Sequence, residues 1–186
     1  MLYVVKYTGP FGYLKPWTAV RDGETYSQQF LTPSVIEGMR QKLGVSAILR
    51  HKLTYTGLSM QQEQTQPRGW IHEKKKQQMT RPRAILMRGV LLEPELHLAF
   101  ASAEDAEIAA RQHLCLCRNE DIVLPVGRLT LNEAGFDALA GFELRRADAA
   151  ETGAFLVGFN RFTEGAPMHG RLEITGNPIR QVAAVL

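Results

Sequence analysis

The sequence predicts an α+β fold built around a single hydrophobic core, and three observations support this. The chain has 186 residues, a length that suits one domain. Its composition, 45% hydrophobic and 22% charged, is that of a globular protein. Segments rich in β-formers alternate with two segments of helical periodicity. Apolar runs stay shorter than the roughly 18 residues of a membrane span, and residues 1–6 form a strand-like start without the layout of a secretory leader, so we expect a cytoplasmic protein.

The first elements are a strand, a loop and a helix. Residues 2–8 carry Val and Tyr at strand-like positions, and the following segment to about residue 30 is rich in Gly, Pro and aromatic residues. Thr32 can cap a helix, and Pro33 suits its first position because no N–H donor is needed there. Apolar side chains then recur at helical spacing, and Gly44 is a good terminator. We therefore predict a helix over 33–43.

A long hairpin is expected next. Residues 46 to about 60 read as one strand, and residues 83–100 read as the returning strand, with an interruption at Glu93-Pro94 because proline belongs at a strand edge or break. The segment 61–80 between them lacks a core-forming period. This segment is predicted to be a projecting tip.

The remaining elements complete a recognisable order. Ser102 can cap a helix that extends to about residue 114. The later segments are a strand with a turn over 115–126, a helical turn near 133–139, and strands at 155–159 and 171–175. Through residue 126 the order is β-α-β-β-α-β, the split-βαβ pattern of ferredoxin-like and RRM-like domains. We expect a domain over 1–126 and a small β-rich extension over 127–186 packed on the same core.

Charge is divided unevenly along the chain. Residues 1–88 carry fourteen Lys or Arg against five Asp or Glu, a net charge of +9. Residues 89–186 carry eight against fourteen, a net charge of −6. A basic half attracts polyanions, and nucleic acid is favoured over an anionic membrane because no basic amphipathic helix is present. The acidic half suits a protein neighbour.

Cations in the basic half are interleaved with aromatic residues, a pattern that suits phosphate contact together with base stacking. The start of the 33–43 helix adds free N–H groups that can bind a phosphate. The alternative is that the aromatic residues are buried anchors and the lysine run is a solvated surface. The candidate RNA-binding residues are Lys15, Trp17, Arg21, Thr32, Ser34, Arg50, His51, Lys52, Arg68, Trp70, Lys74, Lys75, Lys76, Arg81, Arg83 and Arg88.

Catalysis has weaker support in the sequence. The glycine-rich nucleotide-binding, zinc-protease and serine-hydrolase motifs do not occur. Metal-free RNA cleavage needs a base, an acid and a cation, which His51, Lys52 and Tyr55 could supply, with His72 beside Lys74 as a second set. The string His113-x-Cys115-x-Cys117 is more typical of two reduced thiols than of a metal site. We expect no metal and no cofactor.

One stretch of the chain resembles a known protein family. Residues 26–39, Tyr-Ser-Gln-Gln-Phe-Leu-Thr-Pro-Ser-Val-Ile-Glu-Gly-Met, are similar to the strand-loop-helix signature of the Cas-five family of CRISPR-associated proteins, within the RAMP superfamily. The basic strand 48–52, the projection and the returning strand 80–83 follow in the family's order. Residues 117–128 are similar to its later Pro-and-Gly turn. The resemblance spans roughly residues 1–130.

The resemblance implies a non-catalytic subunit of a Cascade-like RNA-guided complex. Such a subunit binds the 5′ handle of the guide RNA and contacts backbone and large subunits. Thr32, Pro33 and Ser34 would contact handle nucleotides, and the projection at 61–80 would be the family's thumb. Members that process guide RNA use a Tyr, Lys and His set that has no unique counterpart here. Two alternatives stay open, a metal-free endoribonuclease and a protein-assembly adaptor.

Overall fold

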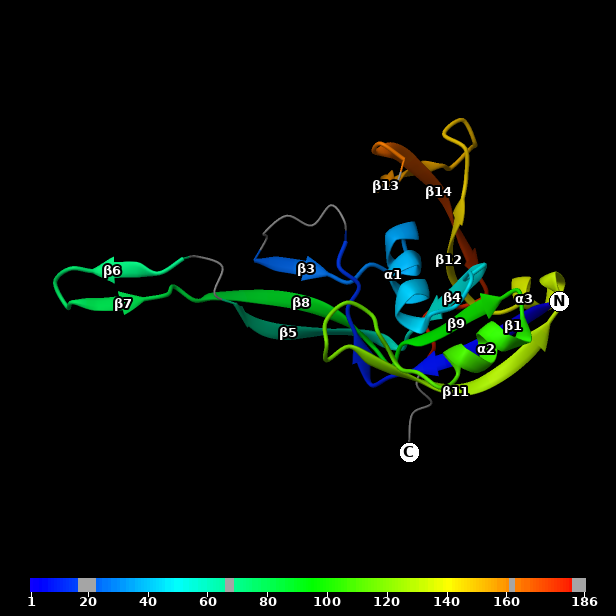
Figure 1. Cartoon of the computed structure of the whole chain (residues 1–186), viewed down its shortest axis with the longest axis horizontal. Coiled ribbons are helices and arrows are strands. Elements are labelled where there is room, and N and C mark those ends of the chain that lie inside the picture. The colour runs from blue at the N-terminus through cyan, green and yellow to red at the C-terminus, as the bar shows by residue number, and fades with distance from the viewer. Residues whose placement is uncertain (17–22, 66–68, 161–162, 182–186) are drawn as a thin grey trace.

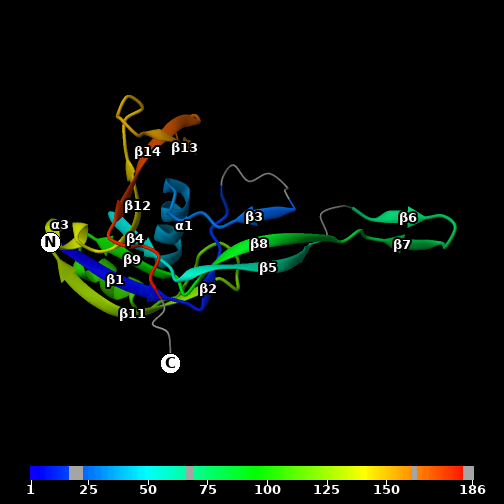
Figure 2. The same ribbon diagram turned by 180° about the vertical axis from the view of Figure 1, so that it is seen from behind.

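The computed structural model describes residues 1–16, 23–65, 69–160 and 163–181. Figure 1 shows a body of sheet and helices, from which a long two-stranded hairpin projects on one side. A second, shorter arm made of C-terminal strands rises beside helix α1 (Pro33–Leu43). The reverse view in Figure 2 shows the same separation of hairpin, body and arm. We call the hairpin the thumb and the shorter projection the arm.

The body contains the predicted ferredoxin-like sheet. Its four central strands are β1 (Leu2–Thr8), β4 (Arg50–Thr54), β9 (Glu95–Phe100) and β11 (Ile122–Leu131). They lie in the order β11-β1-β9-β4, with each neighbouring pair antiparallel. This is the strand order of a split βαβ unit, so the predicted α+β class is confirmed.

Two helices cover one face of this sheet. Helix α1 contributes Met39 and Leu43 to the main core, and helix α2 (Ala103–Ala109) contributes Ala106 and Ala109. The fully buried Tyr7 of β1 donates its hydroxyl to the carbonyl of Ala109 at 2.7 Å, which fixes α2 on the sheet. Because side chains alternate along a strand, this face also receives every second residue of β4.

Helix α1 begins and ends where the sequence predicts. Gly44 closes it in the left-handed conformation, with φ of 70°. Thr32 has extended N-cap dihedrals, but its side chain makes no capping hydrogen bond in the described structure, so the predicted hydroxyl cap is wrong. In α2 the predicted cap is present, since Ser102 Oγ accepts from Asp105 N at 3.1 Å, although the helix ends five residues before residue 114.

The thumb is longer than the predicted 61–80 segment. Its strands are β5 (Gly57–Thr65) and β8 (Ala84–Leu92), paired in continuous register, and its tip is the small hairpin of β6 (Ile71–Glu73) and β7 (Gln78–Thr80). Strand β8 also pairs with β2 (Phe11–Gly12) and β3 (Glu24–Tyr26) from the first loop. The thumb therefore forms a small sheet of its own near the body.

The C-terminal strands widen the main sheet. β12 (Gly141–Arg146) lies beside β4, β14 (Ala166–Thr175) beside β12, and β13 (Phe155–Asn160) at the edge. β10 (Leu114–Cys115) borders the other edge, and α3 (Glu133–Asp137) matches the predicted helical turn. The expected boundary at residue 126 falls inside β11. No helix among the described residues is long and apolar enough to span a membrane.

Candidate nucleic-acid interface

The structure divides the candidate RNA-binding residues into an exposed group and a buried group. Lys15 of the first loop, Ser34 of α1 and the cations of the thumb tip are exposed, whereas Thr32 is 6% exposed and β4 turns Arg50, His51 and Lys52 into the protein. Three candidates, Trp17, Arg21 and Arg68, are outside the described residues.

The thumb tip is the most exposed basic segment. Lys74, Lys75 and Lys76 lie in the turn between β6 and β7 and are all exposed. Lys76 Nζ is 3.2 Å from a Glu73 carboxylate oxygen at the surface, a contact that contributes little because water screens it. Trp70, 65% exposed, precedes the tip. The tip thus offers ammonium groups beside an aromatic ring.

Three further cations line the route from the tip to the body. Arg81 and Arg83 are exposed on the connection into β8, and Lys15 is exposed in the first loop. Arg88 differs, because its guanidinium is 3.0 Å from Glu63 across the thumb and 5.5 Å from the Tyr13 ring centroid. Arg88 therefore stabilises the base of the thumb, and Glu63 already neutralises its charge.

The start of α1 opens onto a groove of about 770 Å³ between that helix and the arm. Pro33 and Ile36 form part of one wall, and Met168 and His169 of β14 form part of the other. An adjoining hollow reaches Ser34, which is exposed. The first turn of α1 has no acidic residue, so the positive end of its dipole is not neutralised there by a carboxylate of its own.

Two arginines on the groove wall differ in availability. Arg40 donates to both Glu37 carboxylate oxygens, at 2.8 and 2.9 Å, and these hydrogen bonds lower the pKa of Glu37 to about 2. Arg146 at the end of β12 is exposed and has no carboxylate partner within the described part of the chain. Arg146 is therefore a cation that the sequence analysis missed, although Arg145-Arg146 is a conspicuous basic pair within the acidic half.

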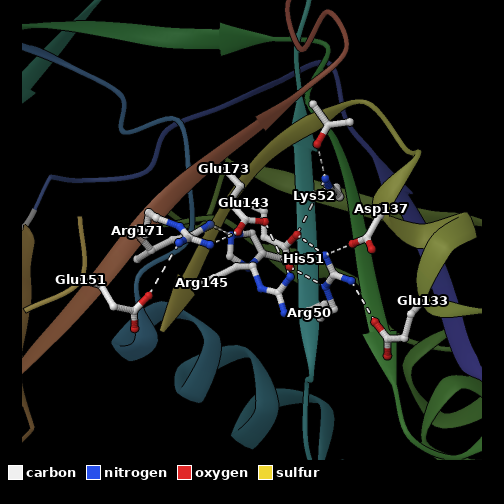
Figure 3. Close-up of polar contacts among 12 residues, drawn as sticks. Arg50, His51, Lys52, Glu133, Asp137, Glu143, Arg145, Glu151, Arg171 and Glu173 are labelled. Atoms are coloured by element: carbon white, nitrogen blue, oxygen red, sulfur yellow. Dashed lines mark hydrogen bonds and ion pairs between the residues drawn. The ribbon is translucent and has the colours of Figure 1, made fainter. Parts of the chain in front are cut away.

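Arg50 lies at the centre of a buried ion network (Figure 3). Its Nε and Nη2 donate to the two oxygens of Glu143, at 2.8 and 2.7 Å. Its guanidinium also contacts Glu133 at 2.9 Å and Asp137 at 2.7 Å, and it stacks on the Phe136 ring at 4.6 Å. Such a bidentate carboxylate pair holds Arg50 in one orientation and raises its pKa.

Lys52 points to the same face as Arg50, two residues further along β4. It is 1% exposed, donates to Thr175 Oγ1 at 2.7 Å and lies 3.8 Å from Glu143. Burial lowers the pKa of Lys52, and the nearby Glu143 charge opposes this shift.

His51 points to the opposite, helix-covered face and is 1% exposed. Its Nε2 accepts the backbone N–H of Leu144 on β12 at 3.2 Å and that of Leu31 before α1 at 3.4 Å. Strands β4 and β12 share one paired position, Phe142 with Leu53. The imidazole thus extends the connection between the two strands beyond their ladder.

The prediction of an open basic strand at 50–52 needs correction. Arg50 and Lys52 bind Glu143 on one face of β4, and His51 binds Leu144 on the other, so the three residues join the C-terminal strands to the ferredoxin sheet.

Tyr55, another candidate for RNA cleavage, is 1% exposed and stacks on Phe142, so it is buried as well. A buried imidazole whose Nε2 already accepts two N–H groups cannot reach a 2′-hydroxyl. His72 on the thumb tip is the exposed member of the cleavage candidates.

Burial of His51 makes stability depend on pH. Desolvation, with the Lys52 and Arg50 charges, lowers the pKa of His51 to about 3. In the unfolded chain the imidazole takes up a proton below about pH 6.5, so between these values the unfolded state binds more protons and stability falls as pH decreases. This residue should lower the free energy of unfolding by about 2 kcal/mol between pH 7 and pH 5. Urea unfolding of wild type and His51→Gln at pH 7 and pH 5 measures this change. Equal losses of unfolding free energy in the two proteins would show that His51 is not its source.

The thiols and histidines form no metal cluster in the described residues. Cys115 and Cys117 are both free, and Cys115 lies on the short edge strand β10. The side chain of Cys115 is partly exposed and that of Cys117 is exposed.

Comparison with known proteins shows a likeness to solved structures. No family model matches the chain, and no curated protein matches it. Among solved structures, a chain described as "CRISPR RNA-guided surveillance complex" superposes with a TM-score of 0.55. The likeness covers 99% of this chain and 94% of the other, at 13% sequence identity. The two chains therefore share a fold over almost their whole lengths.

Proposed function

We propose that this protein is a subunit of a CRISPR RNA-guided effector complex that binds the 5′ handle of the guide RNA. The observation that carries the proposal is the thumb, which projects from a ferredoxin-like body and bears Lys74, Lys75 and Lys76 at its exposed tip. The full-length fold likeness to a chain of a CRISPR RNA-guided surveillance complex supports it. The sequence resemblance over residues 26–39 supports it independently.

The handle would be held at two places. Ammonium groups at the thumb tip would bind phosphates, and Trp70 would stack on a base. The start of α1, with exposed Ser34, would bind a phosphate or base edge beside the groove lined by Pro33 and Met168. Arg146 on the groove wall adds a cation that could reach the same strand of RNA.

Protein partners would cover a different surface. Strand β10 pairs with β11 at residues 122 and 123, and no strand among the described residues pairs with the outer edge of β11 beyond them. Leu124, Val126 and Leu129 on this segment are 55%, 56% and 43% exposed. An apolar, unpaired strand edge is a surface that a neighbouring subunit commonly covers. Backbone and large subunits of the complex are the partners we propose.

Binding of defined RNA tests the proposal. Fluorescence anisotropy would compare a labelled RNA that carries the repeat-derived 5′ handle with a scrambled RNA of equal length. We expect tighter binding of the handle RNA at about 0.1 M salt and a steep loss of affinity with added salt, because phosphate contacts release counterions. Equal affinity for both sequences would reject handle recognition. Precursor RNA incubated with the protein in EDTA distinguishes the alternatives. A metal-free endoribonuclease would cleave it, whereas a binding subunit would leave it intact.

A further inference from the structure

The thumb joins the body at an interruption that affects both of its strands. On one side, Tyr55 and Thr56 separate β4 from β5, and on the other side Glu93 and Pro94 separate β8 from β9. Glu93 adopts φ of 45°, a left-handed conformation that is unfavourable for a residue other than glycine. The regular ladder thus stops at the point where the thumb leaves the sheet. The direction of the thumb must therefore depend on contacts from outside the hairpin.

The segment after β14 supplies such contacts on the first side of the interruption. Tyr55 N donates to the carbonyl of Pro178 at 3.1 Å, and Arg180 N donates to the carbonyl of Tyr55 at 2.7 Å. Tyr55 and Ile179 form an isolated parallel bridge. Residues 178–180 therefore act as a short extra strand beside the break in β4 and β5.

The side chain of Arg180 reaches the second side of the interruption. Its Nη1 donates to the Glu95 carboxylate at 3.2 Å, and its Nη2 donates to the backbone carbonyl of Glu93. Glu95 is partly buried and also binds Lys6 of β1 at 2.8 Å, so the guanidinium is connected to the body of the sheet. A single residue thus contacts both strands of the thumb at the point where they are interrupted.

We propose that residues 177–180 form a strap that fixes the angle at which the thumb leaves the body. The backbone of the strap binds Tyr55, and the guanidinium of Arg180 binds Glu93 and Glu95. Loss of the strap therefore removes one set of restraints on the interruption and leaves the backbone bond from Glu93 to Pro10. The strap follows directly from β14, which is also a strand of the arm. It therefore couples the position of the arm to the direction of the thumb. This inference does not depend on RNA binding.

Two substitutions of Arg180 remove the strap contacts in steps. Arg180→Ala removes the contacts with Glu93 and Glu95 and keeps the backbone bond to Tyr55. Arg180→Pro also removes the N–H that Tyr55 accepts. Arg171→Ala is the matched control, because Arg171 is an ion-paired, exposed arginine of β14 that contacts Glu151 and Glu173 and does not touch the interruption.

Pulsed electron–electron double resonance of the whole chain reports the direction of the thumb as a distance between two spin labels. Spin labels at Gln64→Cys on the thumb and Glu104→Cys on α2 use exposed positions, with Cys115 and Cys117 replaced by serine. We expect one narrow distance distribution for wild type and Arg171→Ala, a broader one for Arg180→Ala and the broadest for Arg180→Pro. Hydrogen exchange at the Tyr55 amide should accelerate at least about tenfold in Arg180→Ala, because this variant loses two charged hydrogen bonds and the loss of one has an effect of about that size.

An unchanged distance distribution in both Arg180 variants would overturn the strap. If Arg180→Pro fails to fold, Arg180→Ala with an intact circular dichroism spectrum decides alone, and a wild-type distribution in that variant rejects the proposal. Because no RNA is present in the measurement, its outcome is independent of handle binding.

Discussion

Glu143→Ala is expected to destabilise the protein by about 3–5 kcal/mol, the usual cost of removing one partner from a buried ion pair. Glu143 is 1% exposed and neutralises Arg50 through two hydrogen bonds, with Lys52 3.8 Å away. Without this carboxylate, the Lys52 ammonium is buried with Thr175 as its hydrogen-bond partner. Arg50 keeps Glu133 and Asp137, but these carboxylates are 67% and 57% exposed, so water screens their charges. Urea unfolding at pH 7 measures the loss.

Glu173→Ala is the matched control for Glu143. Glu173 occupies the corresponding position on β14, where it binds Arg171 at 2.8 Å nearer the surface. Its removal should cost about 1 kcal/mol or less, since exposed ion pairs contribute little. Equal losses for the two variants would mean that the buried network does not hold the C-terminal strands to the sheet.

Reversal of the thumb-tip charge should produce the largest effect on RNA binding. In the variant Lys74→Glu, Lys75→Glu, Lys76→Glu, three exposed ammonium groups become carboxylates. If each lysine binds one phosphate of single-stranded RNA, each contributes about 0.7 to the slope of log affinity against log salt. The variant should therefore lose about two units of slope and about a hundredfold in affinity near 0.1 M salt. Fluorescence anisotropy over a salt series gives both values.

A control variant with the same change in net charge distinguishes local contacts from overall charge. Arg111 just after α2, Arg128 on β11 and Arg171 on β14 are exposed and lie away from the thumb. Their joint replacement by glutamate should change affinity little, because charges beyond about 10 Å are screened near 0.1 M salt. A similar loss in both variants would show that the thumb tip is not a specific RNA contact.

Local sequence signals predicted most of the fold. The helix over 33–43 and the strand over 2–8 match α1 and β1 because capping residues, glycine and period are local properties. Strand β12 was missed, since residues 141–146 end in Arg145-Arg146 and carry Glu143 in the interior. The burial of Glu143 depends on a partner 93 residues away, and no local pattern indicates such a pairing.

The lack of a local pattern for distant partners also affected the prediction of the candidate site. The sequence-based prediction of exposed cations was correct for Lys74, Lys75 and Lys76, where no hydrophobic period competes with exposure. At residues 50–52 the basic character of the sequence predicts exposure, but β12 and α3 supply the carboxylates that allow burial. The sequence contained one indication of these partners. The carboxylates Glu133 and Asp137 are four residues apart and therefore lie on one face of a helix.

The central claim is that RNA lies along the thumb and the start of α1. Photo-cross-linking of 4-thiouridine-substituted handle RNA to the full-length protein, followed by mass spectrometry of the peptides, locates the RNA directly. RNA bound along these surfaces should give cross-links at Lys15 and at the exposed or groove-lining residues of the segments 69–83 and 33–41. Cross-links concentrated on α2 and β11, with none on the thumb tip, would contradict it.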